Sequence, residues 1–184
     1  MTEVYFLGAG KPFKGEQHSA LHDIDNSSKV LDWSLEAINF FNPKCFFVCG
    51  YQAEALKASH PKLKYIENKE WESTKAGWSL LTALSKESKD MLVSYSDIVF
   101  RESAVKNMLK SDGDIVVAVD SQWRSRYSGR NFEELNKCEK VCLSKNTINL
   151  LGSNIDTNQA NAEFIGLVYF SKKATKELLK IKNK

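Results

Sequence analysis

A glycine-rich segment near the start of the chain has the residue types that could hold phosphate. Gly8-Ala9-Gly10 follows the apolar run at residues 4–7, and Lys11 and Lys14 come soon after it. Glycines at the end of a strand leave backbone N–H groups uncovered, and the lysines add positive charge beside them. The segment favours a phosphate-binding loop. An ordinary tight turn is the alternative, because Phe13 stands where a dinucleotide fingerprint would have its third glycine.

Two aspartates that end apolar runs could bind a metal ion. Asp97 ends the run at residues 90–97, and Asp120 ends the run at residues 114–120. A carboxylate at the tip of a buried strand suits Mg²⁺, which prefers oxygen ligands and keeps waters and substrate phosphates in its other positions. The alternative is a local role, in which Asp97 caps the next helix and Asp120 opens a turn.

Strand and helix signals alternate along the chain and would position these residues. The predicted strands are residues 4–7, 45–50, 63–66, 90–97, 114–120, 140–143, 147–150 and 164–170, and the predicted helices are residues 30–41, 52–59, 77–85, 102–110 and 172–184. This alternation indicates a three-layer α/β domain with a mostly parallel sheet. Residues 114–120 are uniformly apolar, so we expect them at its centre. Ligands of such sheets bind at the carboxyl ends of the strands.

Composition limits the class of protein. The chain has 184 residues, 42% of them hydrophobic and 27% charged, so we expect one domain over residues 1–184. The last thirteen residues hold six lysines and one glutamate, more than the whole net charge of +3, which argues against a nucleic-acid surface. No apolar run approaches the roughly 20 residues of a membrane span, and no signal-peptide pattern is present. We expect a cytoplasmic protein without a nucleic-acid or membrane partner.

The cysteines and histidines do not match a metal-binding pattern. The pairs Cys45/Cys49 and Cys138/Cys142 lie within strand-like segments, so we expect reduced thiols that pack as small hydrophobic residues. His18 and His22 would share a helix face, but no third ligand follows nearby, and a zinc site is not expected.

Several short blocks together resemble a known enzyme family. They are Gly8-Ala9-Gly10, Val30-Leu-Asp-Trp-Ser-Leu, Val48-Cys-Gly-Tyr-Gln-Ala-Glu54, Asn68 through Thr74 with Trp78-Ser-Leu80, Tyr95-Ser-Asp-Ile-Val-Phe100, Val119-Asp-Ser-Gln-Trp123 and Glu163-Phe-Ile-Gly-Leu167. By their order and spacing the chain resembles the small nucleotidyltransferases of the phosphocholine and 2-aminoethylphosphonate cytidylyltransferase type, within the sugar-phosphate nucleotidylyltransferase-like superfamily. The resemblance implies a Rossmann-like, three-layer domain with a mixed, mostly parallel sheet.

The resemblance also implies a reaction. An acceptor phosphate or phosphonate oxygen would attack the α-phosphorus of a nucleoside triphosphate, with CTP favoured, and pyrophosphate would leave. Positioning and charge neutralisation supply most of such catalysis. By position, Asp97 would bind Mg²⁺, and Lys11 and Lys14 would neutralise the triphosphate. The residues implied in nucleotide binding are Leu7, Gly8, Ala9, Gly10, Gln17, Thr74 and Ser79.

The resemblance places part of the acceptor region in the second half of the chain. The implied acceptor residues are Asp120, Trp123, Tyr127, Arg130 and Glu163. Aromatic faces and Glu163 would suit an ammonium group, and Arg130 would suit a phosphate, which favours choline or aminoethyl acceptors. As an alternative, Trp123 and Tyr127, four residues apart, would be core residues on a short helix.

The chain departs from the family pattern at two points. The family has a Pro-Lys pair before a small residue and a leucine, where this chain has His18-Ser19 before Ala20-Leu21. The family's late aspartate, a second metal ligand, has no counterpart after Glu163. These departures leave open a chain that lacks the family's C-terminal portion, and a nucleotide-binding or regulatory module without turnover. A sugar-1-phosphate nucleotidylyltransferase and a homo-oligomer are also left open.

A nucleotide-sugar-dependent glycosyltransferase is a weaker alternative. Such enzymes normally carry Asp-x-Asp at the metal tip, and here Tyr95 stands in place of the first aspartate.

Overall fold

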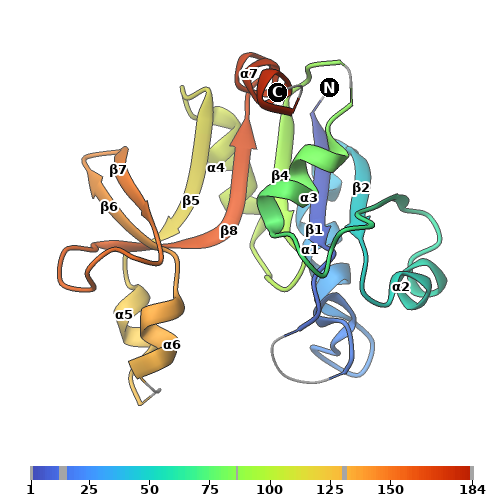
Figure 1. The fold of residues 1–184 in the computed structure, drawn as a ribbon, viewed down its shortest axis with the longest axis horizontal. Helices are drawn as coiled ribbons and strands as arrows, with labels where there is room; N and C mark the ends of the chain where they lie inside the picture. Colours follow the sequence, from blue (N-terminus) through green and yellow to red (C-terminus); the bar gives the residue numbers. More distant parts are fainter. Residues whose placement is uncertain (1, 13–15, 86, 130–131, 183–184) are drawn as a thin grey trace. The chain divides into compact units, whose positions relative to one another are not determined.

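The chain divides into two compact units in the computed structural model (Figure 1). Unit 1 comprises residues 1–116 and 168–184, and unit 2 comprises residues 117–167. The structure describes residues 2–12, 16–85, 87–129 and 132–182.

Strands and helices alternate through most of the chain. The strands are β1 (Glu3–Gly8), β2 (Lys44–Cys49), β3 (Lys64–Glu67), β4 (Met91–Tyr95), β5 (Ile115–Asp120), β6 (Lys140–Ser144), β7 (Thr147–Gly152) and β8 (Ala162–Phe170). The α-helices are α1 (Val30–Ile38), α2 (Ala53–Ser59), α3 (Ala76–Ala83), α4 (Glu102–Lys110), α5 (Trp123–Arg126), α6 (Phe132–Lys137) and α7 (Lys172–Lys182), and the short 3₁₀ helices are η1 (Ser19–Leu21) and η2 (Asn39–Phe41). Strand pairing follows the order β3-β2-β1-β4-β8-β6-β7, and β5 pairs with β8.

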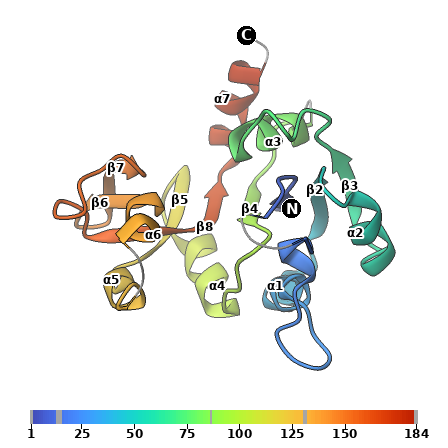
Figure 2. The same cartoon turned by 60° about the horizontal axis from the view of Figure 1, so that its bottom comes forward.

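Unit 1 is built on parallel strands with helices on both faces. β1 pairs in parallel with β2 and β4, and β2 pairs in parallel with β3. The apolar residues of β1 alternate between the two faces of the sheet. Figure 2 shows α3 and α7 on one side of these strands and α1 and α4 on the other.

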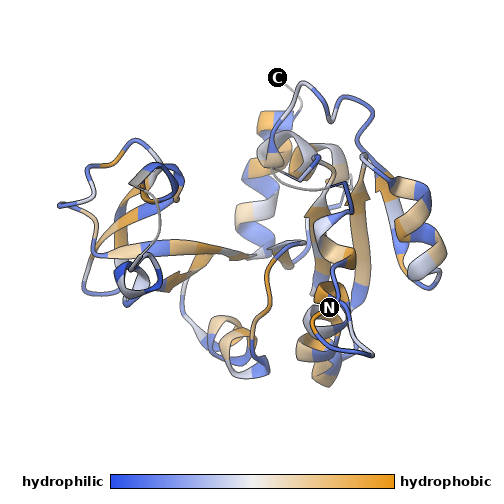
Figure 3. Ribbon diagram, turned by 90° about the horizontal axis from the view of Figure 1, so that it is seen from below, coloured by the Kyte–Doolittle hydropathy of each residue, from blue (hydrophilic) through white to orange (hydrophobic). Residues whose placement is uncertain are grey.

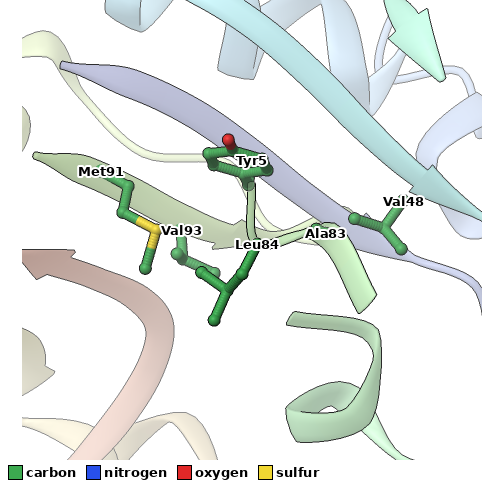
Figure 4. Close-up of a cluster of buried hydrophobic side chains, with 6 residues drawn as sticks. All are labelled: Tyr5, Val48, Ala83, Leu84, Met91 and Val93. Carbon is green, nitrogen blue, oxygen red and sulfur yellow. The ribbon is translucent and has the colours of Figure 1, made fainter. Parts of the chain in front are cut away.

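Both faces of the unit 1 strands are covered by apolar side chains. The cluster on one face consists of Tyr5, Val48, Ala83, Leu84, Met91 and Val93 (Figure 4). Leucines of α3 and α7 pack against it. Val4 and Phe6, which point to the opposite face, are fully buried. In Figure 3 the hydrophobic colours concentrate on the strands and on one side of several helices, while the loops are largely hydrophilic.

Unit 2 has a small core of its own. The hairpin of β6 and β7 is antiparallel, and β6 also pairs with β8 in antiparallel register. Trp123, Cys138 and Ala160 form a buried cluster, against which Tyr127 packs. The buried Nζ of Lys140 donates to three backbone carbonyls, which ties the end of α6 to the residues after β7.

The predicted α/β architecture with a mixed, mostly parallel sheet is confirmed, with the parallel pairs at the end formed by β1 to β4. The predicted elements form close to their expected bounds. The central placement of residues 114–120 was wrong. β5 pairs with β8 alone among the described strands, and its residues are half-buried or exposed, Ile115 by 56%. A continuous apolar run is typical of a strand that is covered on both faces, but the run alone does not determine how many strands flank it. Within the described residues, no helix is both long and apolar enough to span a membrane.

Candidate nucleotide-binding site

The predicted nucleotide-binding residues lie where parallel strands of unit 1 end. Gly8 of β1 stands opposite Cys49 of β2, and Leu7 stands opposite Tyr95 of β4. The loops that follow these strands therefore begin at the same edge of the sheet. The N–H of Ser96 donates to the carbonyl of Leu7 at 3.2 Å, which holds the beginning of the β4 loop against β1.

Two glycines allow these loops to approach one another. A Cβ at Gly8 would lie 2.5 Å from the ring of Phe47 and would overlap the hydroxyl of Ser96. A Cβ at Gly50 would lie 2.5 Å from the side chain of Trp71 and 2.7 Å from the carbonyl oxygen of Ala9. Because close-packed atoms cannot come so near without displacement, only glycine fits either position as it stands.

The loop after β1 offers backbone donors that the described residues do not use. Neither the N–H of Gly10 nor that of Lys11 meets a hydrogen-bond acceptor within the described part of the chain. Gly10 is exposed, and a Cβ there would have no atom within 4 Å. The Nζ of Lys11 lies 5.7 Å from the centre of the Tyr51 ring. Uncovered amides beside a lysine suit an anion such as a phosphate.

His18 is buried directly beside this loop. Its Nε2 lies 2.7 Å from the carbonyl oxygen of Gly8, and its Nδ1 accepts the N–H of Ala20 at 3.1 Å. The backbone N–H of His18 donates to Oε1 of Gln52 at 2.9 Å. Burial lowers the pKa of His18 below its usual value, although the Gly8 carbonyl and the charge of Asp97 act in the opposite direction. The lowered pKa and the hydrogen bond that Nδ1 accepts from Ala20 both favour the neutral imidazole at neutral pH.

A buried amide joins two further predicted residues. Nδ2 of Asn68 donates to the hydroxyl of Thr74 at 3.0 Å and to that of Ser79 at 3.1 Å. The N–H of Asn68 donates to the carbonyl of Cys49, so this group sits at the carboxyl end of β2. Ser79 is buried, and contact of Thr74 or Ser79 with a nucleotide stays a prediction.

Asp97 is the predicted metal ligand, and its carboxylate is exposed two residues after β4. It does not cap the following helix, because α4 begins at Glu102 with Arg101 as its N-cap. Within the described residues, no three His, Cys, Asp or Glu side chains form a cluster that could hold a metal ion. One carboxylate still fits Mg²⁺, which commonly takes one or two protein carboxylates together with substrate phosphates. The Mg²⁺ role of Asp97 stays a prediction.

Of the remaining predicted residues, the structure describes Gln17 but neither Lys14 nor Arg130. Gln17 is exposed, and its Nε2 donates to the carbonyl of Leu21 at 2.8 Å. Lys14 lies outside the described residues, as does Arg130 of the predicted acceptor region.

Unit 2 brings three predicted acceptor residues into one hydrogen-bonded group, in which Arg126 joins two of them. Nε of Arg126 lies 2.8 Å from a carboxylate oxygen of Asp120, and another guanidinium nitrogen donates to Glu163 at 2.5 Å. The hydroxyl of Tyr127 donates to the other oxygen of Glu163 at 2.5 Å. Burial raises the pKa of Tyr127, and the hydrogen bond to Glu163 adds to this effect. Asp120 also accepts the N–H of Gln122, as expected for a residue that opens a turn.

Trp123 lies in the core of unit 2, with only 1% of its surface exposed. Its ring centre is 6.1 Å from that of Tyr127 in an edge-to-face arrangement. This packing agrees with the alternative interpretation, in which Trp123 and Tyr127 are core residues. Contact between a ligand and a face of the Trp123 ring stays a prediction.

Known proteins are similar to this chain over most of its length. A CTP:phosphoglutamine cytidylyltransferase from Campylobacter jejuni is 23% identical over 179 residues, which cover 91% of this chain and 70% of that protein. The solved inositol-1-phosphate CTP transferase from T. maritima superposes with a TM-score of 0.70 at 21% identity, over 96% of this chain and 73% of that one. The chain has the nucleotidyltransferase fold. No family model matches it.

A second solved structure of this fold agrees. The CTP:phosphocholine cytidylyltransferase from Streptococcus pneumoniae superposes with a TM-score of 0.65 at 11% identity, over 100% of this chain and 76% of that one. At these identities the structural likeness establishes the fold. Together with the Campylobacter relative, it confirms the resemblance to cytidylyltransferase-type nucleotidyltransferases and supports an enzyme.

Four residues that take part in these contacts were not predicted for either site. His18, Gln52 and Ser96 belong to unit 1, and Arg126 belongs to unit 2. His18 stands where the family pattern has proline, and this substitution was the one available signal for it. Arg126, four residues before the predicted Arg130, has no comparable signal, because its partners lie at distant positions in the sequence.

Proposed function

We propose that this chain is a Mg²⁺-dependent cytidylyltransferase that transfers CMP from CTP to a small phosphate or phosphonate acceptor and releases pyrophosphate. The observation that carries the proposal is the loop after β1, where the amides of Gly10 and Lys11 have no acceptor among the described residues and share one sheet edge with Asp97. The base and the type of reaction are proposed because the Campylobacter, T. maritima and Streptococcus proteins are CTP transferases by name.

In the proposed reaction, an oxygen of the acceptor's phosphate or phosphonate forms a bond to the α-phosphorus of CTP. The bond from that phosphorus to the bridging oxygen of the β-phosphate breaks, and pyrophosphate leaves with the bonding electrons. The amides of the loop hold the triphosphate in line, and Lys11 offsets negative charge that builds up on the leaving group. Lys14, close in sequence, is proposed for the same task.

Asp97 would hold Mg²⁺ beside the triphosphate. When bound, the ion supplies charge neutralisation on the phosphate oxygens. Asp97 itself contributes one negatively charged oxygen ligand at a fixed place after β4, and the hydrogen bond from Ser96 to Leu7 sets that place.

The acceptor is proposed to carry a cationic group. The hydrogen-bonded cluster of unit 2 contains two carboxylates, those of Asp120 and Glu163, and the guanidinium of Arg126. The net charge of these three groups is therefore negative. Such a cluster favours an ammonium group over a neutral sugar. Arg130 stays the proposed partner of the acceptor's phosphate.

A nucleotide-binding module without turnover is the second candidate. Ser19 takes the position at which the family pattern has the lysine that faces the reacting phosphates. If the chain binds CTP without reacting, the absence of this lysine would explain the lack of turnover.

One screen separates the two candidates. Pyrophosphate release is measured with CTP, ATP, UTP or GTP, with and without Mg²⁺, and with phosphocholine, 2-aminoethylphosphonate or sugar 1-phosphates as acceptors. We expect Mg²⁺-dependent release with CTP and a cationic acceptor. Nucleotide binding with no release in any combination would support the module, and preferred use of a sugar 1-phosphate would contradict the proposed acceptor.

A further inference from the structure

The imidazole of His18 has one defined tautomer in this structure. The N–H of Ala20 is a donor and points at Nδ1 at 3.1 Å, so Nδ1 must present a lone pair. The proton of the neutral ring then lies on Nε2, which can donate to the carbonyl oxygen of Gly8 at 2.7 Å. His18 is 2% exposed and its ring meets Phe47 edge to face, with 5.8 Å between ring centres, so packing also fixes the orientation of the ring.

This hydrogen bond sets the direction of a peptide plane in the nucleotide loop. In a trans peptide the C=O of one residue and the N–H of the next point in opposite directions, and no described peptide bond is cis. With the carbonyl of Gly8 turned toward His18, the N–H of Ala9 points away from it. The carbonyl of Ala9 is held in turn by the N–H of Tyr51 at 2.9 Å, which directs the N–H of Gly10 away from Tyr51.

Gln52 holds the backbone on which His18 is mounted. Its Oε1 accepts the N–H of His18 at 2.9 Å, and its Nε2 donates to the carbonyl of Glu16 at 2.6 Å. The hydroxyl of Tyr51 donates to the same carbonyl at 2.7 Å. Residues 16–18 are therefore anchored to the loop after β2, and the ring of His18 reaches Gly8 from a fixed base.

We propose that His18 is a positioning residue of the nucleotide site, and that its Nε2–H sets the Gly8–Ala9 peptide so that the loop amides face the phosphates. This inference rests on the proposed binding of CTP by that loop. His18 occupies the position of a proline in the family pattern. Because proline has no side-chain N–H, the family pattern does not include this hydrogen bond.

Two substitutions separate the two hydrogen bonds of the ring. The amide nitrogen of glutamine reaches the place of Nε2, so His18→Gln can keep the donor to Gly8. Asparagine is shorter and places its oxygen near Nδ1, so His18→Asn keeps the acceptor for Ala20 and loses the donor to Gly8. The exposed His22→Asn serves as the control for loss of a nearby imidazole.

Dissociation constants for Mg²⁺–CTP are measured for the wild type and the three variants, together with amide hydrogen exchange at Ala9 and Gly10. We expect His18→Asn to weaken CTP binding about tenfold and to change the exchange of both amides, as the loss of one buried hydrogen bond implies. His18→Gln should stay within about threefold of the wild type, and His22→Asn should bind CTP as the wild type does. Equal effects of Gln and Asn, or weaker binding by Gln, would overturn the proposal.

Two further readouts keep the proposal independent of folding defects and of the proposed function. ¹⁵N NMR of the wild-type imidazole should show a protonated Nε2 and a bare Nδ1, and the opposite tautomer would refute the proposal even if both variants fail to fold. If the wild type binds no nucleotide, the proposed function fails, whereas unchanged exchange of Ala9 and Gly10 in His18→Asn refutes the positioning role by itself.

Discussion

The ring of Phe47 lies directly against the backbone of Gly8, so closely that a Cβ on Gly8 would come within 2.5 Å of it. A side chain of β2 therefore restricts which residue can stand at the end of β1, where the nucleotide loop begins. The ring occupies the space that any other residue at position 8 would need.

Gly8→Ala is expected to lower the free energy of unfolding by about 1–3 kcal/mol, the usual cost of forcing extra volume into a packed site. It should also displace Ser96, whose hydroxyl occupies the same space. Gly10→Ala is the matched control, because nothing lies within 4 Å of a Cβ there. Chemical denaturation of both variants measures the difference. Equal stability of the two variants would contradict this account of the Gly8 contact.

Asp97→Asn is expected to keep the fold and to lower Mg²⁺-dependent pyrophosphate release by a factor on the order of 100 or more. The side chain is exposed, so its replacement removes charge without opening a cavity. Asp112→Asn, exposed in the loop after α4, is the control. Activity of Asp97→Asn within a few-fold of the wild type would remove Asp97 from the metal site.

Lys11→Ala should cost about 2–4 kcal/mol of transition-state stabilisation, a roughly thirty- to thousandfold fall in kcat/KM. The lysine belongs to the loop after β1, where the triphosphate is proposed to bind and where the amide of Gly10 has no acceptor among the described residues. Steady-state kinetics with CTP measure the effect, and the exposed Lys62→Ala is the control. If neither Lys11→Ala nor Lys14→Ala changes kcat/KM, other groups must hold the phosphates.

Glu163→Gln should raise the KM for a cationic acceptor by about tenfold, because it removes a charge from the unit 2 cluster. The dissociation constant of CTP should not change, since among the described residues the carboxylate of Glu163 is bonded to Arg126 and Tyr127, both in unit 2. Glu134→Gln, an exposed change on α6, is the control. A parallel loss of CTP and acceptor binding would argue for general damage to the fold instead.

Stability should depend on pH through Glu3. Burial alone would raise the pKa of Glu3, but hydrogen bonds from Tyr5 and Lys89 and nearby lysine charges bring it below its ordinary value of 4.5. The carboxylate therefore stabilises the fold above pH 4.5, and this contribution is lost as the pH falls through 4.5 toward the folded-state pKa.

Urea titrations at several pH values compare the wild type with Glu3→Gln. The difference in unfolding free energy should be largest near neutral pH and shrink below pH 4.5. Glu87→Gln, an exposed carboxylate near the same lysine, should show a smaller dependence. A difference that does not change with pH would contradict the role of the charge.

Local sequence was enough to predict the strands, the longer helices and the loop after β1, whereas the short helices α5 and α6 were not among the predicted helices. Apolar runs next to glycine or polar residues mark strands wherever they lie in the chain, and Gly8-Ala9-Gly10 marks the point where β1 ends. The resemblance to nucleotidyltransferases depended on the order and spacing of short sequence blocks, which can be read from one sequence alone.

The partners of individual side chains were decided by the tertiary structure alone. Gln52 meets His18 across 34 residues of sequence, and Glu163 meets Arg126 across 37. The same holds for β5, whose apolar run pairs with β8 among the described strands. Propensity and hydrophobic pattern act over a few neighbouring residues, whereas burial and hydrogen bonding depend on which distant segments fold against each other.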